Sequence, residues 1–358
     1  MRMRAKAISI LFAISTVGSS VARADYQITA LPALPGSPQS FADAISPGGV
    51  IGGTSVSWDT SNIYDVPTLW QNGQPIALPI PSGYLAGVSA INSNGVSIGT
   101  LQTQTGSLSP ILWQNGQAQK LDNLGLPDVV PTGINNAGTI VGYGSDLENG
   151  IDVATTWTNG KATALGSSYT AAYGINNAGQ ILVIGEQNGD TVWSLLSGDR
   201  ATPITPPTGT TMAARFLDDA GDVVGDIFHP DTQTNEAFIW RNGVFDVLPS
   251  LPGDTLEIAY GVNDSGVVVG SGGTPDGIGH ALMWKDGQVI DLDSLIPSNL
   301  GWEGLSPLVI ADDGTIIGTG SLNGEITGFE LTPAAVPEPA SLAILALGAT
   351  ALLRRRRR

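Results

Sequence analysis

Short apolar segments separated by turn-forming residues run through most of the chain. In the clearest example, residues 133–142 read Gly-Ile-Asn-Asn-Ala-Gly-Thr-Ile-Val-Gly, so that an apolar residue precedes the turn and β-branched residues follow it. Asn side chains bond their own backbone in such turns, and glycine adopts the positive φ that other residues avoid. The pattern predicts a β-hairpin.

The same pattern occurs seven times, and we number the copies as repeats 1 to 7. Their central glycines are separated by 46, 43, 41, 42, 45 and 48 residues. The copies cover 44–53, 90–99, 133–142, 174–183, 216–225, 261–270 and 309–318, with central glycines Gly49, Gly95, Gly138, Gly179, Gly221, Gly266 and Gly314.

A second hairpin pattern follows each of the first six copies. It is clear in Leu112-Trp113-Gln114-Asn115-Gly116, because Asn-Gly between apolar runs is a strong hairpin signal. Each repeat of about 43 residues therefore predicts four strands, as in a propeller blade. The recurring tryptophans are interpreted as core between blades rather than as a sugar-binding platform. They are Trp70, Trp113, Trp157, Trp193, Trp240 and Trp284.

The two ends of the repeat array are complementary. Repeat 7 ends at 328–331 without a fourth strand, and residues 26–31, Tyr-Gln-Ile-Thr-Ala-Leu, resemble the missing one. Pairing of this segment beside Phe329 would leave no long open edge. The sequence thus predicts an all-β, seven-bladed β-propeller over residues 25–331, closed by its N-terminal strand.

Residues 1–24 have the features of a signal peptide. A basic start precedes an apolar run at 7–17, and Ala22 and Ala24 form a small-x-small cleavage site. This pattern predicts export through the Sec machinery.

The other end of the chain predicts a membrane-associated tail. A linker over 332–339 contains Pro337-Glu338-Pro339, and the apolar segment 340–353 follows. As a transmembrane helix its 14 residues would extend about 21 Å, less than the ~30 Å hydrocarbon core. The cytoplasmic stop-transfer end predicted by the positive-inside rule is Arg354, Arg355, Arg356, Arg357 and Arg358.

This tail closely resembles the PEP-CTERM sorting signal. Its Pro-Glu-Pro motif, single hydrophobic helix and basic end occur in the same order in that family. The resemblance implies recognition by an exosortase, cleavage near the motif, and transfer of the domain to the cell surface or the medium. The inner membrane would then be a transient anchor.

The repeats also resemble HAF repeats of bacterial exported proteins. The resemblance rests on Gly-Ile-Asn-Asn-x-Gly followed by Trp-x-Asn-Gly, and it covers most of residues 26–331. Only His280-Ala281-Leu282 approaches the His-Ala-Phe triplet of that family. This resemblance implies architecture and export, and no activity.

The amino-acid composition excludes several kinds of site. The chain has no cysteine and only two histidines, His229 and His280, which excludes disulfides and thiolate sites. Between Asp25 and Ala335 there are 31 acidic and 6 basic residues. Such a surface repels nucleic acid and anionic membranes and attracts cations.

The sequence does not predict a group of catalytic residues. The Gly-x-Ser-x-Gly at 95–99 is interpreted as part of repeat 2, because no helix follows Ser97. The densest carboxylates are all assigned to repeat turns as structural Asx residues, with calcium binding as an alternative. They are Asp218, Asp219, Asp222, Asp226, Asp312 and Asp313. We expect no other cofactor, no metal ligands and no catalytic residues.

The leading hypothesis is an exported, surface-directed, non-enzymatic protein that binds or scaffolds the envelope or the exopolysaccharide matrix of a biofilm. The link to polysaccharide comes from the resemblance to sorting-tail proteins. The alternative is a carbohydrate-active hydrolase or lyase with carboxylates at the mouth of the propeller.

Overall fold

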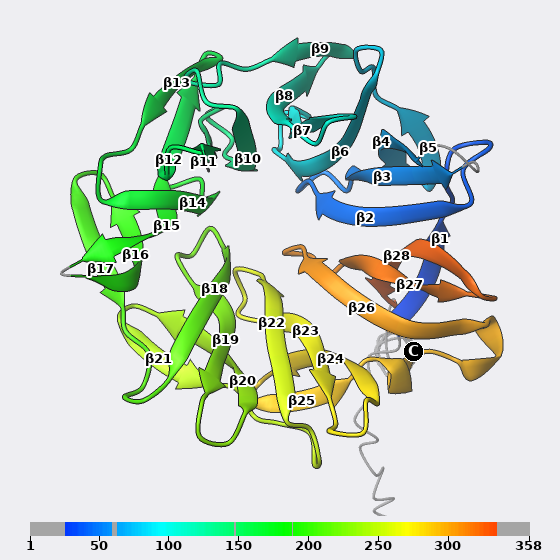
Figure 1. Cartoon of the computed structure of the whole chain (residues 1–358). Helices are drawn as coiled ribbons and strands as arrows, with labels where there is room; N and C mark the ends of the chain where they lie inside the picture. The colour runs from blue at the N-terminus through cyan, green and yellow to red at the C-terminus, as the bar shows by residue number, and fades with distance from the viewer. Residues whose placement is uncertain (1–25, 59–62, 147, 188, 335–358) are drawn as a thin grey trace, which may run out of the picture. The chain divides into compact units, whose positions relative to one another are not determined.

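The described part of the chain is built almost entirely from β-strands. The computed structural model describes residues 26–58, 63–146, 148–187 and 189–334. Its strands pair antiparallel in groups of four, which follow one another in chain order (Figure 1). The prediction of an all-β fold is confirmed. Two 3-10 turns, Asp293–Leu295 and Ser298–Leu300, are the only helices among these residues.

Each repeat supplies strands in the same order. The first strands are β2 (Gln39–Ile45), β6 (Tyr84–Ile91), β10 (Asp128–Ile134), β14 (Tyr169–Ile175), β18 (Thr211–Leu217), β22 (Leu256–Val262) and β26 (Trp302–Ile310). The second strands are β3 (Ile51–Trp58), β7 (Ser97–Thr103), β11 (Ile140–Asp146), β15 (Gln180–Gln187), β19 (Val223–His229), β23 (Val268–Gly273) and β27 (Ile316–Leu322). The third strands are β4 (Ile63–Gln71), β8 (Leu108–Gln114), β12 (Ile151–Thr158), β16 (Asp190–Ser197), β20 (Thr234–Arg241), β24 (Gly279–Lys285) and β28 (Glu325–Pro333). The fourth are β5 (Gln74–Ala77), β9 (Gln117–Lys120), β13 (Lys161–Ala164), β17 (Arg200–Ile204), β21 (Val244–Val247), β25 (Gln288–Asp291) and, in repeat 7, β1 (Tyr26–Leu31).

Both predicted turn types form. Between the first and second strands of repeat 3, Gly138 has a φ of 81°, and the central glycine of every other repeat also has a positive φ. Between the third and fourth strands of repeat 2, Asn115 and Gly116 have φ values of 52° and 72°. Positive φ at both positions is the requirement of a type I′ hairpin turn.

The sheets pack against one another in sequence order. The sheet of repeat 1 contacts those of repeats 2 and 7, through β2 with β6 and β2 with β28. Repeats 5 and 6 also share one parallel backbone pair, Asn235 opposite Leu256. The N-terminal strand β1 pairs antiparallel with β28, with Ala30 opposite Phe329, as the sequence predicts.

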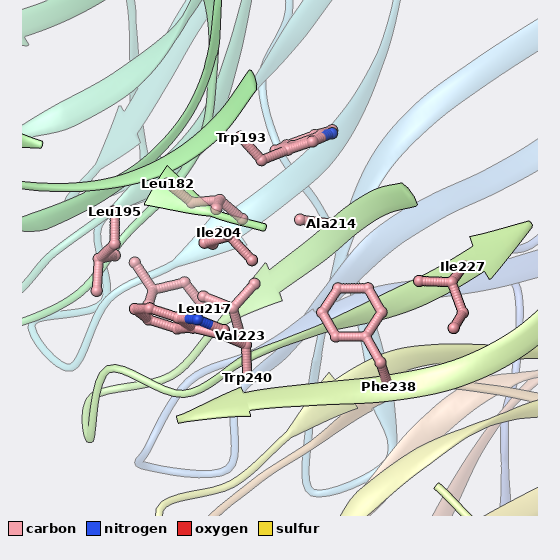
Figure 2. Close-up of a cluster of buried hydrophobic side chains, with 10 residues drawn as sticks. All are labelled: Leu182, Trp193, Leu195, Ile204, Ala214, Leu217, Val223, Ile227, Phe238 and Trp240. Atoms are coloured by element: carbon pink, nitrogen blue, oxygen red, sulfur yellow. The ribbon is translucent and has the colours of Figure 1, made fainter. Parts of the chain in front are cut away.

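The recurring tryptophans are buried in the cores between sheets. Trp70, Trp113 and Trp157 are exposed by 2% or less. The Trp157 indole N–H donates to the Asp122 carbonyl at 2.6 Å, which ties the third strand to the segment that enters the repeat. Trp70, Trp113 and Trp284 make the same bond to proline carbonyls. Figure 2 shows the core that contains Trp193 and Trp240, between the sheets of repeats 4 and 5.

The compact unit spans Tyr26–Pro333. It extends two residues past the predicted boundary at 331, because Gln27 and Tyr26 pair with Thr332 and Pro333. No helix long and apolar enough to cross a bilayer occurs in the part of the chain that the structure describes. The predicted signal peptide, Pro-Glu-Pro motif, helix 340–353 and terminal arginines lie outside the described residues.

Candidate functional site

The first strand of every repeat carries a β-bulge at the same position. In repeat 3, for example, the register with β11 shifts between Pro131 and Gly133, which leaves Thr132 unpaired in the ladder. A bulge inserts one residue and re-aims its side chain. The equivalent bulge residues are Asp43, Ser89, Thr132, Tyr173, Arg215, Tyr260 and Leu308.

The last glycine of the repeat pattern is sterically required by this bulge. A Cβ on Gly142 would overlap the carbonyl oxygen of Val130, two residues before the bulge residue Thr132. The same overlap would occur in repeats 1, 2, 5, 6 and 7, at Gly53, Gly99, Gly225, Gly270 and Gly318. Repeat 4 has Val183 at this position, and its first strand has a second register shift. The glycine therefore allows the close approach of two backbones.

All seven bulge residues line one cavity, which we call the central chamber. Its volume is about 500 Å³, within the range of cavities that hold small molecules. Figure 1 shows the first strands of the sheets facing the middle of the compact unit. The chamber is thus the one described site to which every repeat contributes the residue at the same position.

The only base lining the chamber, Arg215, is held by a buried carboxylate. Its Nε donates to Asp226 Oδ1 at 2.7 Å, and Asn235 Nδ2 donates to Asp226 Oδ2 at 2.8 Å. The prediction that Asp226 lies in a repeat turn is wrong. It lies within β19, where it is 6% exposed, and these two donors compensate its burial.

Asp43 is the only carboxylate lining the chamber, and it lacks such partners. Among the described residues, its carboxylate has no hydrogen-bond donor and no ion-pair partner. Burial raises the pKa of the Asp43 carboxyl from its ordinary value to about 6. The chamber therefore contains one carboxylate whose charge no described residue compensates.

Three further polar bulge residues, Ser89, Thr132 and Tyr173, are of two kinds. The hydroxyls of Ser89 and Thr132 donate to carbonyls of the next repeat, Pro131 at 3.1 Å and Ala172 at 2.8 Å. Tyr173 is 40% exposed, and its ring packs on Trp193 with centroids 4.9 Å apart. The hydroxyls thus join repeats, whereas Tyr173 presents an aromatic surface.

A second, smaller cavity of about 180 Å³ adjoins the chamber and shares Ile45, Ile175 and Leu217 with it. The turns of repeats 5, 6 and 7 contribute Asp219, Asp264 and Asp312 to this cavity, and we call these three exposed residues the acidic rim. Desolvation, followed by the carboxylates of Asp312 and Asp219, raises the pKa of Asp264. The rim carboxylates of three repeats are therefore close enough to interact.

Turn asparagines connect neighbouring repeats. Asn135 Nδ2 donates to the Asn176 carbonyl at 3.3 Å, and Asn176 Nδ2 donates to the Asp218 carbonyl at 3.0 Å. Asn92 and Asn263 make the equivalent bonds to repeats 3 and 7. In repeat 5 the position is Asp218, whose Oδ1 accepts from the Asp222 N–H at 2.7 Å. Its buried Oδ2 has no partner among the described residues.

Other residues singled out by sequence do not converge. His229 faces Glu236 at 2.8 Å, whereas His280 faces Asp254 at 3.5 Å. Ser97 is 1% exposed at the start of β7. Across the described ranges, no three His, Asp or Glu side chains are grouped so that they could hold a metal ion.

The terminal segment decides where the protein is sent. Residues 335–358 match the PEP-CTERM protein-sorting motif. The chain carries a PEP-CTERM sorting signal. This signal indicates an exported protein that is processed by an exosortase and is anchored to the membrane before release or surface display. No curated protein matches the chain.

Several solved structures are similar to this chain at low sequence identity. TolB from Acinetobacter baumannii is 14% identical over 56% of this chain, with a TM-score of 0.41, and this chain spans only 51% of its length. The β-propeller domain of the Trilobed protease from Pyrococcus furiosus is 11% identical, over 70% of this chain and 97% of its own, with a TM-score of 0.40. A chain of the mitotic checkpoint complex is 12% identical, over 92% and 98%, with a TM-score of 0.51. The four-stranded antiparallel sheets define an all-β fold, and the checkpoint-complex chain shares this fold over most of the chain.

Proposed function

We propose that the protein is an exported, surface-directed, non-enzymatic module that binds or scaffolds exopolysaccharide or other envelope glycans. The observation that carries the proposal is the central chamber, where the bulge residue of every repeat lines one cavity. The bulge positions carry different side chains, from Asp43 to Leu308, although the surrounding pattern repeats. Charge and polarity vary at this position, whereas the other residues that line the chamber are glycine or apolar, and this pattern favours recognition over a purely structural role.

The proposed architecture is a seven-bladed propeller of HAF-type repeats, closed by the N-terminal strand. Its support is the pairing of β1 with β28 and the packing of β2 against β28. Closure would make the chamber a channel with defined ends rather than an open groove. The sorting signal at 335–358 supports a role outside the cell.

A glycan array tests this function. The full chain, labelled and applied with and without calcium, is expected to bind a restricted set of surface polysaccharides. A variant with Tyr173→Ala in the chamber is expected to lose this binding, whereas Asp231→Asn on an exposed turn is not. Absence of binding under both conditions would contradict the proposal.

The competing function is a carbohydrate-active hydrolase or lyase. It is favoured by the carboxylates of three repeats at one cavity, because glycosidases use paired carboxylates with different pKa values. Release of reducing ends from a bound polysaccharide, abolished by Asp264→Asn, would support the enzyme. Binding without turnover would support the module proposed above.

A further inference from the structure

The charges that line the central chamber are unequally compensated. Arg215 is neutralised by Asp226, and its guanidinium carbon lies 5.7 Å from the ring centre of Tyr260. Asp43 lies on the first strand of repeat 1 and has no polar partner among the described residues. A ligand that enters the chamber therefore meets one available charge, and that charge is negative.

The cavity that adjoins the chamber is also negatively charged. The acidic rim lines part of the adjoining cavity, and the lining residues Ile45, Ile175 and Leu217 are common to both cavities. Between Asp25 and Ala335 there are 31 acidic and 6 basic residues. A field of this sign raises the local concentration of cations and lowers that of anions.

The ring of Tyr173 lines the chamber, and the two rings that hold it in place, those of Tyr143 and Trp193, lie outside the lining. The rings of Tyr143 and Tyr173 are stacked with centroids 6.4 Å apart, and Tyr173 in turn packs on Trp193. The face of such a ring attracts an ammonium group, and its apolar surface packs against the C–H groups of a ligand. Both properties suit a ring-shaped ligand that carries an amine.

We infer that the central chamber binds sugar units bearing a free ammonium group, with the ammonium beside Asp43 and the sugar ring near Tyr173. The inference rests on the proposed glycan-binding function and names its ligand class. The acidic rim would receive the neighbouring ammonium groups of the same oligosaccharide. N-acetylation removes the positive charge and leaves the sugar ring, so acetylation should weaken binding.

Two matched oligosaccharides test the inference. The probes are the tetramer of β-1,4-linked glucosamine and the same tetramer fully N-acetylated, titrated calorimetrically into the full chain at low ionic strength. The free amine form is expected to bind at least about tenfold more tightly, as for a desolvated ion pair with an aromatic neighbour. Asp43→Asn should remove most of this difference, whereas the exposed-turn control Asp231→Asn should retain it.

Asp43→Ser is the second variant, because Ser89 occupies the same bulge position in repeat 2 and the fold accepts it there. Equal binding of the two tetramers, binding of neither, or an unchanged preference in both Asp43 variants would overturn the inference. In each case, binding of other glycans on the array would leave the proposed function standing. Absence of binding to any glycan would contradict both the inference and the proposed glycan-binding function.

Discussion

At the scale of single residues, Asp218 occupies the turn position at which an asparagine of other repeats bonds to the next repeat. Four other repeats place an asparagine here, and its Nδ2 donates to a carbonyl in the next repeat. A carboxylate cannot donate, so Asp218 keeps the bond to its own turn and leaves Oδ2 buried without a partner. Burial, followed by the carboxylates of Asp222 and Asp264, raises the pKa of Asp218 to about 7.

This residue gives a prediction about pH. Because the folded pKa of Asp218 lies above its ordinary value of 3.8, the folded state binds the proton more tightly than the unfolded state. Its contribution to stability is therefore fully present below the ordinary value and is lost as the pH rises through about 7. Asp218→Asn restores a donor and should stabilise the protein at pH 8 by about 1–3 kcal/mol. Urea unfolding of both proteins from pH 5 to pH 8 measures the difference.

In the variant, the stability profile should be flatter across this range. Asp231→Asn, on an exposed turn, should leave both the stability and its pH dependence unchanged. If the Asp218→Asn protein is less stable at pH 8 than the parent, the buried Asp218 carboxylate does not destabilise the folded protein.

Among elements, the β-bulge of each first strand depends on a glycine in the second strand. Gly142→Ala should destabilise the protein by about 1–3 kcal/mol or more, since its Cβ would overlap the Val130 carbonyl. The matched control is Gly48→Ala, because a Cβ there meets only Ser46 Oγ at 3.9 Å. Thermal unfolding of the two variants checks the prediction. Similar midpoints for both would show that the bulge does not need the glycine.

Sequence periodicity predicted the strands and turns well because both depend on local chemistry. Asn-Gly pairs and apolar alternation identify a hairpin without knowledge of its neighbours, and Trp157 could be assigned to the core from its regular recurrence. The sequence analysis did not identify the bulges, because no residue type recurs at their positions. Asp43, Ser89 and Arg215, for example, share no chemistry. Gly142 was visible as a repeated glycine, but the carbonyl that requires it belongs to another strand.

The position of Asp226 could not be predicted for a related reason. It is close in sequence to the turn carboxylates, so composition grouped it with them. Its burial depends on Arg215 and Asn235, which lie on the two strands that flank β19. A variable residue six positions before each central glycine of the repeat was the sequence signal that could have identified the chamber.

For the whole molecule, we propose that the chain closes on itself and so forms a single chamber from its seven repeats. The structural basis is the pairing of β1 with β28, where Thr29 lies opposite Glu330. A chain without this pairing would leave repeat 7 with three strands and an open edge. Closure is therefore the feature on which the chamber and its proposed ligand both depend.

An engineered disulfide measures closure most directly, because the chain has no cysteine of its own. Opposed residues on antiparallel strands are close enough for such a bond. The double variant Thr29→Cys, Glu330→Cys should oxidise within one chain, lose its free thiols, and become more stable by up to about 4–5 kcal/mol, because the bond closes a very long loop. Free thiols under oxidising conditions, or disulfides only between chains, would contradict closure.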